Sequence, residues 1–366
     1  MFAGKEKMMK RIVYQEDELT VVGTHYGYSF GTPVPAYKTP VTAKENFYAM
    51  VNHETPCWIP TYDDFCVINP RSVPDNIVHH AVRAVNPLTE DEIVPQKDMF
   101  GIEWEYVPVA GGVTVKPGNP RLSDANEWKE KIPFPDVSSW NWKEDAKLNQ
   151  SYLDNDQPKM TWMFSGFFER LISFMDFEPA ILALIDEEQM DAVKELFDAL
   201  CGLYEEMLTN LKKYYDIDVV YFHDDWGSQR APFFSVNTCR EMLMPYIKRL
   251  CGHCHKLGVL FEMHCCGNVE MLIPVMIEAG VDLWGGQPTA NNFDMLRDQY
   301  GNQITIGIAA PIAPDADDET AYQTAKAYVD KYIPDYTSKP VYITGFLPHI
   351  KQREYLYVLS RKGFGE

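Results

Sequence analysis

A histidine and two adjacent cysteines stand in the segment FEMHCCGN, which runs from Phe261 to Asn268. Imidazole and thiolate together form a ligand set that favours zinc among the common metals. The same residues are also compatible with a redox pair, or with the end of a buried strand that is rich in sulfur. A catalytic zinc usually takes three protein ligands and keeps one position open, so a zinc site here needs a further ligand from elsewhere in the chain.

The alternation of side chains along a β-strand indicates which of these residues share a face. If VLFEMHCC, residues 259–266, is a strand, Glu262, His264 and Cys266 point one way, whereas Cys265 points the other way with apolar neighbours. The Cα atoms of His264 and Cys266 then lie about 6.6 Å apart, which lets both side chains bind one ion. Glu262 lies about 13 Å from Cys266 by the same rise, so we expect it to face substrate or to support a ligand.

A second segment, VVYFHDD at residues 219–225, shows the same arrangement. Alternation places Tyr221, His223 and Asp225 on one face, so two strands direct acids and imidazoles into one interior. Asp224 faces the other way, and we expect its carboxylate to cap the turn that follows its own strand.

Both segments belong to a regular alternation of short β-rich runs and amphipathic helices, which predicts a parallel sheet. The β-rich runs lie at residues 160–166, 219–225, 259–266, 281–286, 304–310 and 341–346. With IPTYDDF (59–65) and GIEWEYV (101–107) the number of strands approaches eight. The first choice is therefore an α/β fold of the TIM (β/α)8 barrel type, and an open doubly wound sheet is the second. In such barrels the active site lies at the C-terminal ends of the strands.

The first part of the chain, residues 1 to about 150, is irregular and rich in Pro, Gly and aromatic residues. We expect one barrel domain over residues 1–366, in which residues 1 to about 45 form an extension that wraps the barrel.

No G-x-G-x-x-G follows a predicted strand and no P-loop motif occurs, so dinucleotide and P-loop functions lose their main support. The CGHC at residues 251–254 lies inside a predicted helix, away from the strand-to-helix junction typical of redox pairs, and indicates packing.

The charge and the hydrophobic pattern of the chain restrict its partners and its compartment. Its 33 basic and 53 acidic residues give a net charge of -20, which disfavours nucleic acid. No run of about 18 uncharged apolar residues occurs, so we expect no membrane span and a cytoplasmic protein. In that compartment the eight cysteines are expected to be buried, metal-bound or reactive rather than paired in disulfides. The sequence leaves the oligomeric state open, homo-oligomers included.

Several of these motifs together resemble the uroporphyrinogen decarboxylase superfamily, which includes cobalamin-dependent methyltransferases. They are Asp-Asp-x-Gly-x-Gln at residues 224–229, the helix with Pro245 and Tyr246, His-x-Cys-Gly-Asn at residues 264–268, EAGVD at residues 278–282, and ITGFLPHI, which ends near His349. The similarity covers about residues 45 to 366, and its most specific element is His-x-Cys-Gly.

The resemblance implies a TIM barrel and, in the methyltransferase branch, a zinc held by His264, Cys266 and a later cysteine. No cysteine follows Cys266 in this chain, so the third ligand is missing. The Arg-Gln-Ala-Gly-Arg loop of the decarboxylases is also absent from the first hundred residues, which argues against a strict porphyrinogen decarboxylase. The long aromatic N-terminal section is more similar to O-demethylase-like members of anaerobes. These move a methyl group from a methoxylated or other small methylated substrate to the Co(I) corrinoid of a partner protein.

That reaction needs stabilisation of the leaving oxygen, by zinc or by a proton donor, whereas the nucleophile is the cobalt. The residues expected to transfer protons are Asp225, His223, Glu262 and His349. His349 is also a candidate third ligand beside His264 and Cys266. The residues expected to position substrate are Tyr221, Gln229 and Asp64.

Three other functions stay open. The first is a decarboxylase or lyase of a small acid that uses His223, Asp225 and His349 without metal. The second is a methylcorrinoid:thiol methyltransferase, which is the reverse direction of transfer. The third is a binding module for corrinoid or partner that has no catalytic activity.

Overall fold

The computed structural model describes residues 12–25, 34–77, 97–107, 112–345, 347 and 349–365. Its centre is a parallel sheet in which seven strands follow the order β11-β10-β9-β8-β7-β6-β3. The strands are β3 (Cys66–Ile68), β6 (Lys159–Met163), β7 (Val219–His223), β8 (Leu260–Cys265), β9 (Leu283–Gly286), β10 (Thr305–Gly307) and β11 (Val341–Tyr342). Thr61, just before β3, forms a parallel bridge with Ile343, just after β11, so the two edges of the curled sheet are linked. The predicted α/β barrel is confirmed.

Each predicted run in the second part of the chain contains a strand of this sheet. The segment 101–107 is different, because β4 (Trp104–Val107) pairs antiparallel with β5 (Gly112–Val115) in a separate two-stranded sheet. The expectation that it contributes a barrel strand is wrong. An antiparallel partner that follows within a few residues satisfies its backbone groups locally, so the segment has no need of the barrel.

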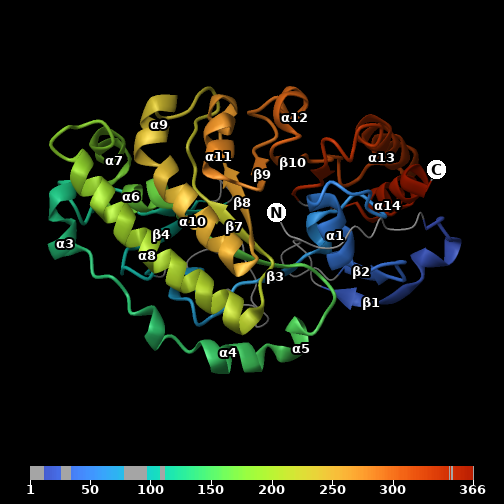
Figure 1. Cartoon of the computed structure of the whole chain (residues 1–366), viewed down its shortest axis with the longest axis horizontal. Coiled ribbons are helices and arrows are strands. Elements are labelled where there is room, and N and C mark those ends of the chain that lie inside the picture. The colour runs from blue at the N-terminus through green and yellow to red at the C-terminus, as the bar shows by residue number, and fades with distance from the viewer. Residues whose placement is uncertain are drawn as a thin grey trace.

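Helices cover the outside of the curled sheet (Figure 1). The described α-helices are α1 (Ala43–Val51), α3 (Trp128–Lys131), α4 (Trp142–Leu148), α5 (Gln150–Leu153), α6 (Phe167–Met175), α7 (Phe177–Ala183), α8 (Met190–Tyr215), α9 (Val236–Met242), α10 (Met244–Leu257), α11 (Ile273–Ala279), α12 (Phe293–Tyr300), α13 (Asp318–Tyr332) and α14 (Ile350–Gly365). The helix that was predicted to contain Pro245 and the CGHC begins at α10, and a break separates it from α9, where Pro245 at the start of α10 lacks a backbone donor. None of the described helices is long and apolar enough to span a membrane.

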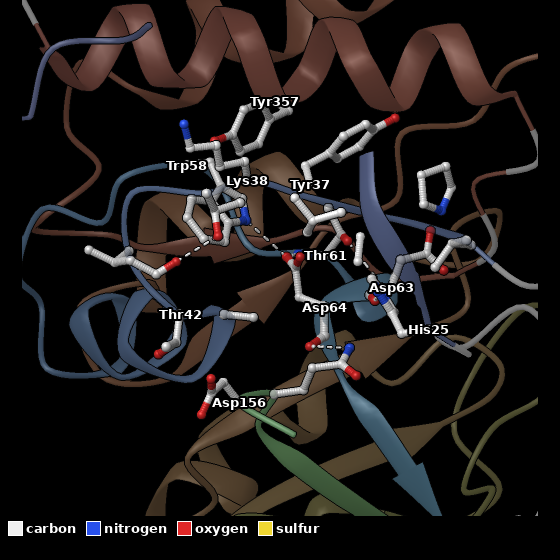
Figure 2. Close-up of a pocket in the computed structure, with 18 of the residues that line it drawn as sticks. His25, Tyr37, Lys38, Thr42, Trp58, Thr61, Asp63, Asp64, Asp156 and Tyr357 are labelled. Atoms are coloured by element: carbon white, nitrogen blue, oxygen red, sulfur yellow. Dashed lines mark hydrogen bonds between the residues drawn. The ribbon is translucent and has the colours of Figure 1, made fainter. Parts of the chain in front are cut away.

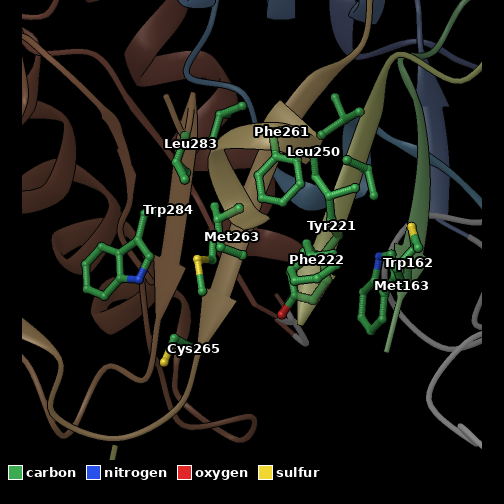
Figure 3. Close-up of a cluster of buried hydrophobic side chains, with 14 of the residues drawn as sticks. Trp162, Met163, Tyr221, Phe222, Leu250, Phe261, Met263, Cys265, Leu283 and Trp284 are labelled. Carbon is green, nitrogen blue, oxygen red and sulfur yellow. The ribbon is translucent and has the colours of Figure 1, made fainter. Parts of the chain in front are cut away.

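The outward faces of the strands pack against these helices. Phe222, Phe261, Met263 and Cys265 are almost completely buried in one apolar cluster, together with Leu250 of α10 (Figure 3). Their positions confirm the predicted alternation, in which these side chains face outward. The side chains between them along each strand therefore face the barrel interior.

The N-terminal section contacts the last helix. β1 (Val21–His25) and β2 (Val34–Tyr37) form an antiparallel pair. Before them, Glu18 accepts two hydrogen bonds of 2.7 Å from the guanidinium of Arg361 on α14, and a third from the hydroxyl of Tyr357. Because Glu18 and Arg361 are both buried, this ion pair fixes the start of the described chain against its end.

A second buried ion cluster connects the irregular section to the barrel. Arg170 of α6 donates to Asp75 and Asp98, both at 2.6 Å, and its side chain is 0% exposed. The two aspartates come from the section before β4, whereas α6 directly follows β6. The cluster thus fixes the first turns of α6, which follow the C-terminal end of β6.

We expect Arg170→Ala to lower the free energy of unfolding by about 3–5 kcal/mol, because it leaves two buried carboxylates without their cation. The matched control is Arg240→Ala, which removes an exposed ion pair with Glu278 and is expected to have a much smaller effect, because solvent screens exposed pairs. Urea unfolding of both variants measures the difference. If both variants lose equally little free energy of unfolding, the buried cluster of Arg170 does not stabilise the fold as described.

Candidate functional site

The parallel pairing of β7 with β8 sets the geometry of the site. Tyr221 lies opposite Glu262 and His223 lies opposite His264. Just beyond the ends of the strands, Asp225 lies on the same side of its chain as His223, and Cys266 lies on the same side as His264. His223, Asp225, His264 and Cys266 each direct one ligand atom into a group whose atoms all lie within 4.8 Å of one another. The structure therefore brings four of the predicted residues together at the C-terminal ends of two barrel strands, where barrel enzymes place their active sites.

Short contacts hold the four residues in place. His264 Nε2 lies 3.3 Å from Cys266 Sγ, and the backbone N–H of Cys266 donates to Asp225 Oδ1 over 2.6 Å. The same carboxylate oxygen lies 3.7 Å from His223 Nε2. The rings of the two histidines stack with their centroids 5.0 Å apart, and the ring of Tyr221, also from β7, stacks on His264 at 5.3 Å. Tyr221 thus borders the cluster, although its side chain is almost completely buried.

Glu169, in the first turn of α6, is a site residue that the sequence reasoning missed. Its Oε2 lies 2.8 Å from His223 Nδ1, so Nδ1–H donates to the carboxylate and Nε2 faces the cluster. The position of Glu169 shortly after β6 is a usable signal, because polar residues after barrel strands gather at the same mouth.

Asp224 supports this arrangement from the other face of β7. Its carboxylate accepts from the backbone N–H groups of Phe167, Phe168 and Glu169 at 2.9–3.1 Å, and so caps the start of α6. The expectation that it caps the turn after its own strand is wrong, because β7 lies beside the start of α6 and the unpaired N–H groups there attract an anion. Burial raises the pKa of Asp224 to about 7.

The two histidines differ in their affinity for protons. Burial lowers the pKa of His264 to about 4, helped by the nearby His223. Burial also disfavours a charged His223, but the carboxylates of Glu169 and Asp225 outweigh it and raise its pKa well above the usual value. Near neutral pH the site therefore holds a neutral imidazole beside a protonated one.

The donor set fits a divalent metal. A neutral imidazole, a carboxylate and a thiol are ligands that zinc accepts, and binding of the cation would displace the thiol proton whose pKa burial now raises. The three ligands His264, Cys266 and Asp225 would leave a position open, whereas His223 as a fourth would close the site. The third ligand, for which the sequence offered His349, thus has two candidates within the cluster, Asp225 and His223.

Glu262 lies deeper in the barrel than the cluster and is 0% exposed. Its Oε1 accepts from the hydroxyls of Tyr62 and of Tyr342, the latter at 2.6 Å. Its Oε2 has no hydrogen-bond partner among the described residues. Burial raises the pKa of this carboxyl to about 7. The structure thus encloses Glu262 between two tyrosines inside the barrel. The carboxyl group, which was predicted to transfer protons, lies deeper than the residues of the cluster.

The remaining predicted residues do not join the cluster. Gln229 donates to Gln287 Oε1 at 2.6 Å, and that oxygen also accepts from the N–H of Gly267, so Gln229 lies at the rim beside Cys266. His349 has backbone partners at both ring nitrogens, the carbonyl of Ala316 and the N–H of Gln352.

Asp64 lies at a different place from the expected mouth. It belongs to the 3-10 helix Tyr62–Asp64, where its carboxylate accepts from the N–H of Thr61 and from Trp58 Nε1. Burial raises its pKa to about 6. The side chain lines a separate pocket beside α14 (Figure 2).

No protein-family model matches the chain. No curated protein matches its sequence. Among solved structures, the fold is similar to that of a methyltransferase from Methanosarcina mazei, with a TM-score of 0.61 and 14% identity over 88% of this chain and 99% of that chain. A B12-independent methionine synthase from Shewanella sp. W3-18-1 also matches, with a TM-score of 0.37 and 13% identity over 61% and 65% of the two chains. The first similarity establishes the fold.

We expect the buried Glu262 to make stability depend on pH. Its pKa is about 4.3 in an unfolded chain and about 7 in the folded protein, so the folded state holds a proton that the unfolded state releases between these values. The contribution of Glu262 is therefore fully present below about pH 4 and is lost as the pH rises through 7. Glu262→Gln, which carries no charge, should be more stable than the parent at pH 8 by up to about 3 kcal/mol, and the gain should vanish near pH 4.5.

Urea unfolding of both proteins from pH 4.5 to 8 measures this difference. Glu278→Gln serves as the exposed control and should show no such trend. A constant difference between Glu262→Gln and the parent at all pH values would contradict the raised pKa.

Proposed function

We propose that this chain is an enzyme that transfers a methyl group from a small methylated substrate, such as a methoxylated aromatic compound, to the Co(I) corrinoid of a partner protein. The observation that carries the proposal is the cluster of His223, Asp225, His264 and Cys266 at the C-terminal mouth of the barrel. The resemblance of residues 224–229 and 264–268 to the corrinoid-dependent branch of the uroporphyrinogen decarboxylase superfamily supports it. The fold shared with a methyltransferase agrees with it.

We assign His264, Cys266 and Asp225 as the ligands of a catalytic zinc. His264 supplies the neutral imidazole, and Asp225 is oriented by the N–H of Cys266. Zinc bound there would act as a Lewis acid on the oxygen that carries the methyl group.

The reaction breaks the bond between methyl carbon and oxygen, and both electrons of the bond stay on the oxygen. The electron pair of the new bond to the methyl group comes from Co(I), so the oxygen must receive positive charge or a proton. We assign His223 as the proton donor, because its Nε2 faces the cluster while Glu169 holds Nδ1 and favours the protonated ring. We assign Tyr221, stacked beside His264, and Gln229, at the rim, as residues that contact the substrate.

The metal assignment makes a prediction for single variants. Cys266→Ser and His264→Ala should lower the affinity for zinc more than about 100-fold, because even residues outside the ligand shell typically contribute 10–100-fold. Cys265→Ser, one residue away but packed outward, is the matched control and should retain zinc. Competition with a chromophoric chelator measures the affinities. If Cys266→Ser and Cys265→Ser retain zinc equally, the assignment fails.

The catalytic assignment is tested by visible spectroscopy of reduced corrinoid, free or on a carrier protein, mixed anaerobically with the enzyme and a panel of methoxylated aromatics. We expect enzyme- and donor-dependent loss of Co(I) with growth of methyl-Co(III). His223→Gln should slow the reaction by about 10²–10⁴-fold while it retains zinc. If a chemical agent methylates the corrinoid but no donor does so with the enzyme, the proposal is contradicted in favour of decarboxylation. If methyl-Co(III) is consumed by a thiol instead, the direction of transfer is the reverse.

A further inference from the structure

The pocket beside α14 is separate from the site described above. It has a volume of about 680 Å³, which is the size of many small-molecule sites. Its walls come from β1, β2, the residues that follow β2, the 3-10 helix Tyr62–Asp64, residues 155–157 and α14 (Figure 2). We call it the N-terminal pocket. None of the four cluster residues His223, Asp225, His264 and Cys266 lines it.

One side of the N-terminal pocket is aromatic. Tyr37, Trp58 and Tyr357 lie near α14 in Figure 2. The ring of Tyr357 stacks on Tyr37 with centroids 6.3 Å apart and lies 5.5 Å from Trp58. Trp58 and Tyr357 are buried, and Tyr357 is held by its hydrogen bond to Glu18, so this side is preformed. Aromatic faces carry negative potential, which attracts cations that are only weakly hydrated.

The other side carries carboxylates. Asp64 and Asp156 line the pocket, and neither forms an ion pair with a described residue. Asp64 is oriented by Trp58 Nε1 at 3.1 Å and by the N–H of Thr61 at 2.8 Å. A carboxylate fixed in this way, and not paired with a basic side chain, leaves negative charge for a ligand.

The other charged groups of the pocket have partners. Arg353 pairs with Asp63 at 2.6 Å, Lys38 pairs with Asp17 at 2.6 Å, and Glu45 caps α1 by accepting from the N–H of Thr42. Asp63 is also nine-tenths buried, and its Oδ1 has no hydrogen-bond partner among the described residues. The charge that remains for a ligand is therefore negative.

We propose that the N-terminal pocket binds a small organic ammonium compound whose charged nitrogen carries methyl groups. Methylation removes the N–H donors that water would hydrate and adds apolar surface that fits Tyr37, Trp58 and Tyr357. The positive charge is balanced by Asp64 and Asp156. The inference is independent of methyl transfer at the cluster, since the two sites share no residue.

Calorimetric titration with choline and with 3,3-dimethylbutan-1-ol tests the proposal. The two probes have the same shape, but the alcohol replaces the charged nitrogen by carbon. We expect choline to bind at least about 10-fold more tightly than the alcohol, because only choline gains the cation–π and carboxylate interactions. Equal binding of the two probes, or binding of neither, would overturn the proposal.

Variants test whether choline binds in the N-terminal pocket or elsewhere on the surface. Asp64→Asn should weaken choline at least about 10-fold and leave the weak binding of the alcohol unchanged. Because Asp64 also fixes Trp58, a second variant, Tyr37→Leu on half-buried β2, removes an aromatic face without touching that hydrogen bond. Asp330→Asn, at an exposed position of α13, is the control and should bind choline as the parent does. Unchanged choline binding in Tyr37→Leu and in folded Asp64→Asn would place choline elsewhere.

Discussion

The candidate site depends on the register in which β7 pairs with β8. His223 lies opposite His264, so the residues two positions further along each chain, Asp225 and Cys266, also meet. A shift of one residue would turn His264 and Cys266 toward the helices and bring Met263 and Cys265 into the interior. Packing prevents that shift, because Phe222, Phe261 and Met263 are buried against the helical layer. The apolar face of the strands thus fixes the position of the polar face.

Helix α6 adds the second constraint, since consecutive residues of its first turns contact different parts of the molecule. Asp224 caps the helix from β7, and Glu169 bonds to His223 at the mouth. The next residue, Arg170, is buried with Asp75 and Asp98 from the irregular section. The orientation of the His223 ring therefore rests on a buried ion cluster that lies outside the barrel sheet.

Much of the barrel followed from the sequence because its signals are local. Strand-to-helix alternation and side-chain parity predicted the sheet, the interior faces of β7 and β8, and the outward position of Cys265. Contacts that depend on the path of the chain around the barrel were not accessible to that reasoning. Glu169 reaches His223 from a neighbouring unit, and Tyr62 reaches Glu262 from a segment two hundred residues earlier. Asp64 was misplaced for the same reason, because a 3-10 helix at Tyr62–Asp64 interrupts the first barrel segment and turns its carboxylate toward Trp58.

We propose that His264, at the end of β8, and Asp225 and Cys266, just beyond β7 and β8, bind a metal through imidazole, carboxylate and a single thiolate. X-ray absorption at the zinc edge, on protein loaded with zinc and washed free of excess, tests it most directly. We predict one sulfur neighbour at about 2.3 Å and nitrogen or oxygen neighbours at about 2.0–2.2 Å, with the sulfur lost in Cys266→Ser. A shell of nitrogen and oxygen alone in the parent, or protein that retains no zinc, would contradict the account.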